Sequence, residues 1–164
     1  MKILTLIRHA KSSWDDPALS DFERPLNARG QHDLPSMVER MQHRGPPPDK
    51  LIFSPALRTR LTAEPLISAF GLDAATVEVS ERTYEATADT LFRLLQQQPD
   101  QTRHLMLIGH NPGLLELAQV LCADAPERMP TAAIIQLHLM IDRWHELTPH
   151  CAELAWLDYP KLHR

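Results

Sequence analysis

A chain of 164 residues suits one domain with a single packed core, because at this length folding buries roughly 70% of the surface that the unfolded chain exposes. It carries 17 basic and 21 acidic residues with no block of lysine or arginine, which argues against nucleic acid and anionic membranes as partners and leaves any anion-binding site local. The two cysteines lie outside any C-x-x-C pattern, and the apolar residues before Arg8 are too few for a signal peptide or a membrane span, so we expect a cytoplasmic protein without a disulfide framework.

Short apolar runs alternate with longer helical stretches along most of the chain. The runs predict strands at residues 2–7, 51–53, 76–79 and 104–108, and the stretches between and after them predict helices at 28–44, 55–70, 88–98 and 112–122. Residues 133–140 and 152–157 are typical of two further strands that form an antiparallel pair. We therefore expect an α/β fold: a single three-layer domain over residues 1–164, with a mainly parallel sheet, flanking helices and an antiparallel edge.

Capping residues indicate where the helices begin and end. Asn27 suits an N-cap, although Pro35 is expected to bend or interrupt the helix that follows it. Ser54 and Pro55 suit an N-cap and a first helical position. Gly71 suits the end of that second helix.

Polar residues of similar chemistry follow three of the predicted parallel strands: Arg8 with His9, Ser54 with Arg58, and His110 with Asn111. Because the carboxyl ends of parallel strands meet at one edge of a sheet, we expect these side chains to lie close together. Guanidinium groups match the oxygens of a phosphate, and helices that begin at this edge add free backbone N–H groups. The sequence therefore predicts a local anion pocket built from two arginines, two histidines and helix N-termini.

Four segments of the chain carry a family resemblance: LIRHAKSSW, RPLNARG, SPALRTRLTA and GHNPGLLEL. In this order they resemble the signatures of the histidine phosphatase superfamily, in the small branch of SixA-like phosphohistidine phosphatases, over residues 4–117. The resemblance implies a phosphoglycerate mutase-like fold. The usual R-H-G of the family reads R-H-A here, with Ala10 in the third position, a variation that we associate with the SixA-like branch.

The resemblance also implies catalytic roles. It makes His9 the nucleophile that becomes phosphorylated, and Arg8, Arg58 and His110 the groups that hold the phosphoryl oxygens. A neutral imidazole is a good nucleophile near pH 7, and nearby cations help to keep it unprotonated. Positioned donors are what a phosphoryl transfer requires, so neither a metal nor a cofactor is expected.

The general acid is less well defined. Glu85, after the third predicted strand, is best placed by topology, while Asp15, Asp16 and Asp21 lie in the loop that follows His9. Expelling an alkoxide calls for such an acid. The imidazole of a phosphohistidine leaves more easily, so a weak acid or water could suffice. An ill-defined acid thus favours cleavage of a P–N bond.

We take Asn111, Ser54 and Lys11 as candidate substrate-binding residues. Each also has a simpler structural interpretation. Asn111 either orients His110 or donates to phosphate, Ser54 is first a helix cap, and Lys11 is expected at the rim of the pocket.

Three further residues have open roles. Arg24 is expected to order its loop through an ion pair rather than to contact phosphate, and Asn27 is most simply a cap. Trp14 either contacts substrate or packs under a loop.

We therefore predict a phosphatase that removes phosphate from a protein phosphohistidine through a phospho-His9 intermediate. The chain is short and lacks long insertions that could form a lid, so an open pocket is expected, which favours a protruding protein side chain. The alternative is a small-molecule phosphomonoesterase of the same superfamily, which would need a competent acid. A phosphate-binding module without turnover is less expected, because a binder does not need a nucleophile. The expected partner is thus a phosphohistidine-containing protein or a small phosphorylated substrate.

Overall fold

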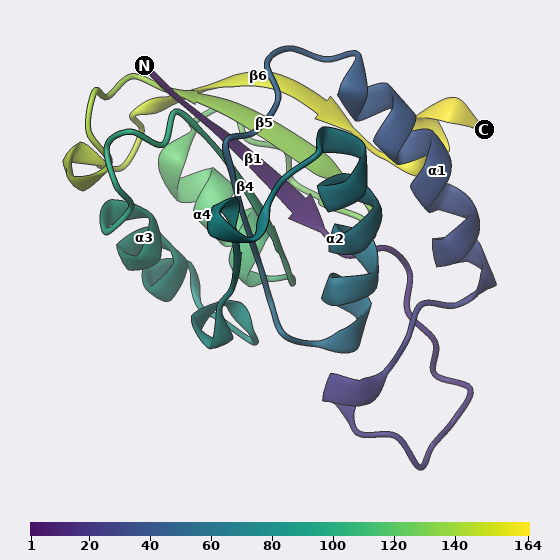
Figure 1. Cartoon of the computed structure of the whole chain (residues 1–164). Coiled ribbons are helices and arrows are strands. Elements are labelled where there is room, and N and C mark those ends of the chain that lie inside the picture. Colours follow the sequence, from purple (N-terminus) through teal and green to yellow (C-terminus); the bar gives the residue numbers. More distant parts are fainter.

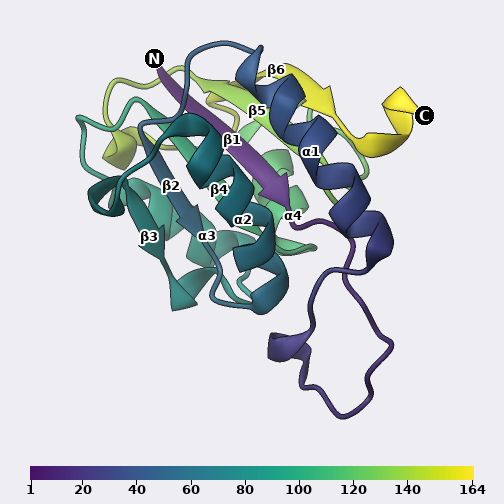
Figure 2. The same cartoon turned by 45° about the vertical axis from the view of Figure 1, so that its right-hand side comes forward.

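The computed structural model describes all residues of the chain, 1–164, as one α/β domain built on a six-stranded sheet (Figure 1). In chain order the strands are β1 (Lys2–Arg8), β2 (Lys50–Phe53), β3 (Val77–Val79), β4 (His104–Gly109), β5 (Ile134–Leu139) and β6 (Ala152–Asp158). They are arranged in the order β3-β2-β4-β1-β5-β6. Neighbours among β1 to β4 pair in parallel, whereas β5 and β6 are added by antiparallel pairing, as the sequence predicts (Figure 2).

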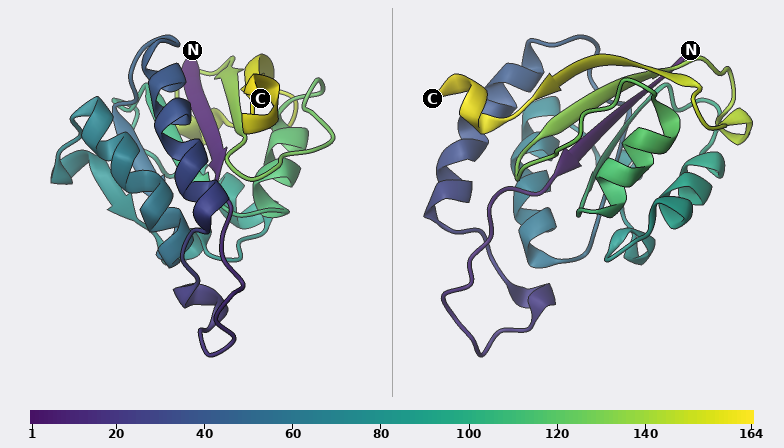
Figure 3. Two further views of the ribbon diagram at one scale, coloured as in Figure 1. Left: turned by 90° about the vertical axis from the view of Figure 1, so that its right-hand side faces the viewer. Right: turned by 180° about the vertical axis from the view of Figure 1, so that it is seen from behind.

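Two helices cover each face of the sheet, which gives the three layers (Figure 3). The helices are α1 (Ala28–Gln42), α2 (Leu57–Phe70), α3 (Ala88–Gln96) and α4 (Gly113–Leu121). Side chains of β1 alternate between two apolar clusters, because successive residues of a strand point to opposite faces. Leu4 and Leu6 pack in the cluster that holds α3 and α4, and Ile7 packs in the cluster that holds α1 and α2.

Most predicted boundaries agree with the structure, and the helix caps explain why. Asn27 accepts a hydrogen bond from the backbone N–H of Gly30 at the start of α1. Gly71 ends α2 in the left-handed conformation, with φ of 62°, which glycine adopts without a steric penalty. Helix α1 continues through Pro35, so the interruption expected at this proline does not occur.

The predicted N-cap of the second helix is wrong. The second helix begins at Leu57 with Ala56 as its N-cap, not at Pro55 with Ser54 as the cap. The Ser54 hydroxyl instead accepts a long hydrogen bond of 3.3 Å from the N–H of Ala56 and lies 2.8 Å from a ring nitrogen of His110. Tertiary contact with His110 thus determines the position of this hydroxyl.

None of the helices is both long and apolar enough to cross a lipid bilayer.

Candidate active site

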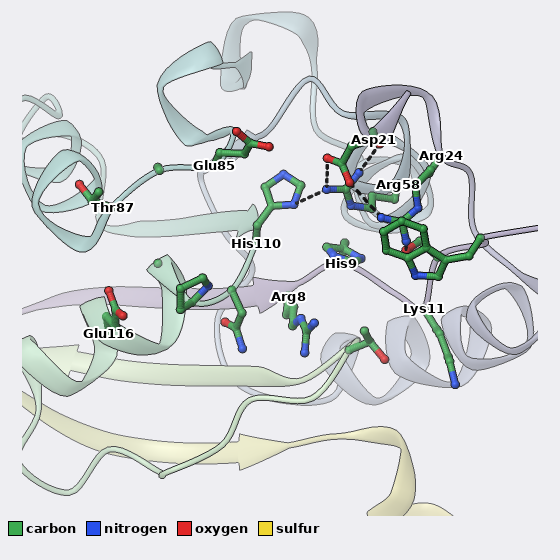
Figure 4. A pocket seen from close by; sticks show the side chains of 17 residues that line it. Arg8, His9, Lys11, Asp21, Arg24, Arg58, Glu85, Thr87, His110 and Glu116 are labelled. Carbon is green, nitrogen blue, oxygen red and sulfur yellow. Dashed lines mark hydrogen bonds and ion pairs between the residues drawn. The ribbon is translucent and has the colours of Figure 1, made fainter. Parts of the chain in front are cut away.

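The carboxyl ends of β1, β2 and β4 meet at one edge of the sheet and surround a cavity of about 560 Å³ (Figure 4). Parallel pairing sets Arg8, the last residue of β1, beside Gly109, the last residue of β4, so that His9 and His110 follow at the same level. The cavity brings together seven of the eight predicted site residues: Arg8, His9, Lys11, Arg58, Glu85, His110 and Asn111.

His9 is buried and held in one orientation. Its Nδ1 lies 2.7 Å from the carbonyl oxygen of Ala10, which can only accept, so Nδ1 carries the proton. The lone pair is therefore on Nε2. Burial lowers the pKa of His9 to about 4, and the positive charges of Arg58 and Arg8 act in the same direction. The imidazole is consequently neutral at pH 7, as a nucleophile must be.

His110 lies next to His9, with the two ring centroids 5.4 Å apart. Arg58 can only donate, and its Nη2 lies 3.4 Å from His110 Nδ1, which leaves Nε2–H of His110 to donate to Ser54 Oγ at 2.8 Å. Burial, followed by the charge of Arg58, lowers the pKa of His110 to about 3. Both rings at the centre of the site are therefore neutral.

Arg58 is the second residue of α2, and Asp21 holds its guanidinium. It donates to the backbone oxygen of Asp21 at 2.7 Å and to the carboxylate Oδ2 at 3.0 Å, and Figure 4 draws this contact beside His110. The other carboxylate oxygen accepts from Arg24 at 3.0 Å, and Tyr84 donates its hydroxyl to Oδ2 at 2.7 Å. One acidic side chain thus joins two cations of the cavity.

Asp21 remains ionised in this setting. Burial opposes its ionisation, but the hydrogen bonds from Tyr84 and Arg58 outweigh this effect and lower its pKa to about 2. A carboxyl group with such a pKa holds no proton to donate near pH 7. Asp21 is therefore unsuited to be the general acid, one of the roles that the sequence left open.

Arg8 is positioned by the loop that precedes β5. Its Nη1 donates to the carbonyl oxygen of Met129 at 3.0 Å, and Asn111 Nδ2 donates to the same oxygen at 2.9 Å. Burial and the nearby charge of Arg58 lower the pKa of Arg8 from its usual value. Asn111 Oδ1 and Arg8 Nε are buried without a hydrogen-bond partner.

The remaining predicted residues occupy different places. Ser54 is fully buried and outside the cavity lining, so it contacts His110 rather than a substrate, which corrects the expectation of direct substrate binding. Glu85 lines the cavity with a left-handed backbone, φ of 51°, which is unusual for a non-glycine residue. Asp15 and Asp16 are exposed and do not line it.

Two of the open roles are also clarified. Arg24 forms the expected ion pair with Asp21 and donates to the carbonyl of Ser13, yet it also lines the cavity. The ring of Trp14 stacks on its guanidinium, with 3.2 Å between the ring centroid and Cζ, and is 76% exposed.

Sequence reasoning missed Glu116 and Tyr84. Glu116 lies in the first turn of α4 and lines the cavity, a position that the predicted helix start at Pro112 could have indicated. Tyr84 fixes Asp21, and no local pattern indicates that contact between residues far apart in the chain. Nowhere in the structure do three or more His, Cys, Asp or Glu side chains form a group that could hold a metal ion.

Comparison with known proteins identifies the family of the chain. The profile of the histidine phosphatase superfamily (branch 1) matches residues 4–110. An uncharacterized protein of Mycobacterium tuberculosis is 30% identical over 165 residues, which cover 94% of this chain and 100% of that protein.

Two solved structures illustrate the similarity of fold. A structure assigned to the phosphohistidine phosphatase SixA of Agrobacterium tumefaciens is 26% identical, with a TM-score of 0.79 over 97% of this chain and 99% of that one. A mycobacterial glucosyl-3-phosphoglycerate phosphatase is 16% identical, with a TM-score of 0.68 over 94% of this chain and 97% of that one. The fold class expected from the sequence is thereby confirmed, and the chain belongs to the histidine phosphatase superfamily (branch 1), in its SixA-like group.

Proposed function

We propose that this protein removes the phosphoryl group from a phosphohistidine carried on another protein, through a phospho-His9 intermediate. One observation carries the proposal: a buried, neutral His9 has its Nδ1 proton bound to the Ala10 carbonyl, and its free Nε2 belongs to a cavity lined by two arginines and a second histidine. A nucleophile next to positioned cations is the arrangement that phosphoryl transfer needs.

The reaction has two steps. In the first, His9 Nε2 forms a bond to phosphorus while the P–N bond of the substrate breaks, and the departing imidazole takes up a proton from water or a site acid. In the second, a water molecule attacks phosphorus, the P–Nε2 bond breaks, and inorganic phosphate leaves. Arg8 and Arg58 neutralise the charge that spreads over the phosphoryl oxygens, and no metal ion is needed for this role.

His110 changes its state when substrate binds. In the free protein its Nδ1 has no proton and accepts from Arg58. A phosphoryl dianion within a few ångströms favours the imidazolium form, because an opposite charge raises the pKa of a histidine. Protonated Nδ1 then donates to a phosphoryl oxygen, while Ser54 continues to orient the ring through Nε2.

Trapping the intermediate tests the nucleophile. We expect the protein, mixed with a phosphohistidine peptide that carries labelled phosphate and denatured in alkali during turnover, to retain label that acid removes, because phosphoramidates are acid-labile. The His9→Ala variant is expected to retain none, and His150→Ala, at an exposed position outside the cavity, is the matched control. Label on His9→Ala would place the nucleophile elsewhere.

The choice of a phosphohistidine over a phosphate ester depends on the proton donor. Asp21 is ionised, which leaves Glu85 and Glu116 as the other carboxylates that line the cavity, and both are exposed to water. An imidazole leaving group depends less on such an acid than an alkoxide does.

Turnover of two substrate types tests this choice. We expect wild type to cleave a phosphohistidine peptide faster than a phosphoserine peptide of the same sequence, and Glu85→Gln to keep most of the P–N activity, with a change below roughly threefold. Glu116→Gln serves as the matched variant on the same rim. A different pair of results would instead support a small-molecule phosphomonoesterase. In that case wild type hydrolyses phosphate esters but not phosphohistidine, and Glu85→Gln loses the ester activity.

A further inference from the structure

A second, larger groove opens beside the active site. It has a volume of about 1050 Å³ and shares Arg8, Lys11, Asn111 and Thr131 with the lining of the catalytic cavity. Its walls are the first turns of α1, the 126–131 loop and the C-terminal segment 157–164. The groove is thus continuous with the site at which the phosphoryl group would bind.

The groove concentrates positive charge on a chain whose formal net charge is −4. Six cationic side chains line it: Arg8, Lys11, Arg29, Arg128, Lys161 and Arg164. Its two carboxylates are Asp33, which is paired with Arg164 at 2.9 Å, and Glu127.

Most of these cations have no partner within the protein. Lys11, Arg29, Arg128 and Lys161 are exposed and take part in none of the ion pairs of the structure. Like charges that converge on one groove repel one another, and an anionic ligand relieves this repulsion. Their spread along the groove suits several separate carboxylates better than one compact anion.

The loop that lines the groove also contacts Arg8 of the catalytic cavity. Arg8 and Asn111 both donate to the carbonyl oxygen of Met129, next to Arg128, so the loop that carries Arg128 also positions Arg8. In Figure 4 the side chains of Arg8 and Lys11 extend away from Arg58 and His110. A ligand that fills the groove therefore lies directly beside the reacting phosphoryl group.

The opposite rim of the catalytic cavity has the reverse charge. Glu85 and Glu116 lie there, on the side of the cavity formed by the 85–87 loop and α4 (Figure 4). A bound chain would accordingly meet cations on one side of its phosphorylated residue and carboxylates on the other. The acidic residues of the bound chain are therefore expected on the side of its phosphorylated residue that faces the groove.

We propose that this basic groove, lined by Arg8, Lys11, Arg29, Arg128, Lys161 and Arg164, binds an acidic segment of the phosphohistidine-carrying protein. The inference rests on the proposed function for the identity of the partner, and on the charge of the groove for the chemistry of the segment. Binding adds electrostatic affinity outside the catalytic cavity and selects among phosphorylated proteins.

Peptide binding tests the inference without requiring turnover. Two fluorescent peptides of equal length carry a central histidine, flanked in one by Asp and Glu and in the other by Asn and Gln, and fluorescence anisotropy reports their affinity at low ionic strength. We expect the acidic peptide to bind wild type roughly tenfold more tightly than the neutral one, and the difference to shrink as salt is added.

Charge reversal locates the binding surface. The double variant Arg128→Glu/Lys161→Glu is expected to lose the preference for the acidic peptide, whereas Arg93→Glu/Arg103→Glu, with the same change of charge at exposed positions outside the groove, keeps it. Because the neutral peptide is measured with every variant, a general loss of folding or binding is separated from a loss of preference.

Three outcomes would overturn the inference: equal affinity for the two peptides in wild type, a preference that survives the groove reversal, or vesicles of anionic phospholipid that bind the groove while the acidic peptide does not. Failure of the proposed function looks different. A phosphohistidine version of the acidic peptide that binds with the expected preference but is never hydrolysed would contradict the phosphatase reaction and support the groove.

Discussion

At the scale of single residues, neighbouring charges and burial set the protonation states in the candidate active site. Two imidazoles remain neutral among three arginines because burial and the neighbouring positive charges disfavour their protonation. The ionised Asp21 compensates part of this positive charge by pairing with Arg58 and Arg24. The site therefore combines a neutral His9 with arginines that other protein groups hold in position.

The pKa of His9 predicts the acid side of the pH profile. His9 attacks only in its neutral form, and lowering the pH through about 4 protonates it, so we expect kcat/KM of wild type to fall near pH 4 rather than near 6.5. Removing the charge of Arg58 by Arg58→Gln raises this pKa and moves the acid limb upward. The profile is measured with a substrate whose own ionisation is titrated separately. A wild-type limb at pH 6.5 would contradict the electrostatic account.

At the scale of elements, the contact between α4 and the 85–87 loop is a tight constraint near the site. A Cβ at Gly113, the first residue of α4, would overlap the carbonyl oxygen of Ala86. Only glycine allows the helix to begin so close to the segment that carries Glu85 and Thr87, both of which line the cavity.

This contact predicts a sharp difference between two glycines. Gly113→Ala is expected to displace the 85–87 loop and to reduce the free energy of unfolding by about 2 kcal/mol, since overpacking against backbone cannot relax easily. Gly109→Ala, whose Cβ would have the flexible Leu114 side chain at 3.6 Å as its nearest contact, is expected to cost less than about 1 kcal/mol. Denaturant unfolding of both variants measures the difference, and equal losses would show that the loop yields without strain.

At the scale of the whole molecule, a buried carboxylate connects the last strand, the first helix and the C-terminus. Asp158 at the end of β6 is 1% exposed and accepts from Arg40 of α1 at 2.8 Å. Its other oxygen lies 2.6 Å from Nε2 of His163. Arg164 continues the connection by donating to Asp33 of α1 at 2.9 Å. These contacts fix the segment that lines the basic groove.

Removing this charge is expected to weaken the whole domain. Asp158→Asn leaves Arg40 without its partner and reduces the free energy of unfolding by about 3 kcal/mol, the usual size for breaking a buried pair. Asp142→Asn is the control, because that carboxylate is 94% exposed and its pair with the N-terminus contributes less than about 1 kcal/mol. Thermal unfolding of both variants measures the difference, and an equal effect would refute the assignment.

The same carboxylate gives a pH dependence. Burial opposes ionisation of Asp158, but its hydrogen bonds from Arg40 and His163 lower its pKa overall. A carboxyl group whose pKa is lowered by folding stabilises the protein fully above the pKa of the unfolded chain, about 3.9. This contribution is lost progressively as the pH falls from that value through the lower pKa of the folded state. Wild type should therefore lose more stability than Asp158→Asn on acidification.

Much of the fold follows from local sequence pattern. The alternation of apolar runs and helical stretches predicted all six strands and all four α-helices, because the periodicity and the caps of each segment indicate which of its residues are buried. The short 3-10 helices were not predicted. The predicted cap at Ser54 was wrong because its hydroxyl can hydrogen-bond either to a helix N–H or to a distant imidazole. The sequence alone does not determine which partner it takes.

The sequence by itself determined the class of the fold, the order of its elements and the residues Arg8, His9, Arg58 and His110 as a set, since strand ends and motif spacing are local properties. Only the tertiary structure decided how Asp21, Tyr84 and Ser54 hold that set, and which cations of distant segments form the basic groove. The physical reason is distance along the chain. Contacts between residues such as Tyr84 and Asp21 depend on how whole elements pack, and packing is a property of the assembled domain rather than of any segment.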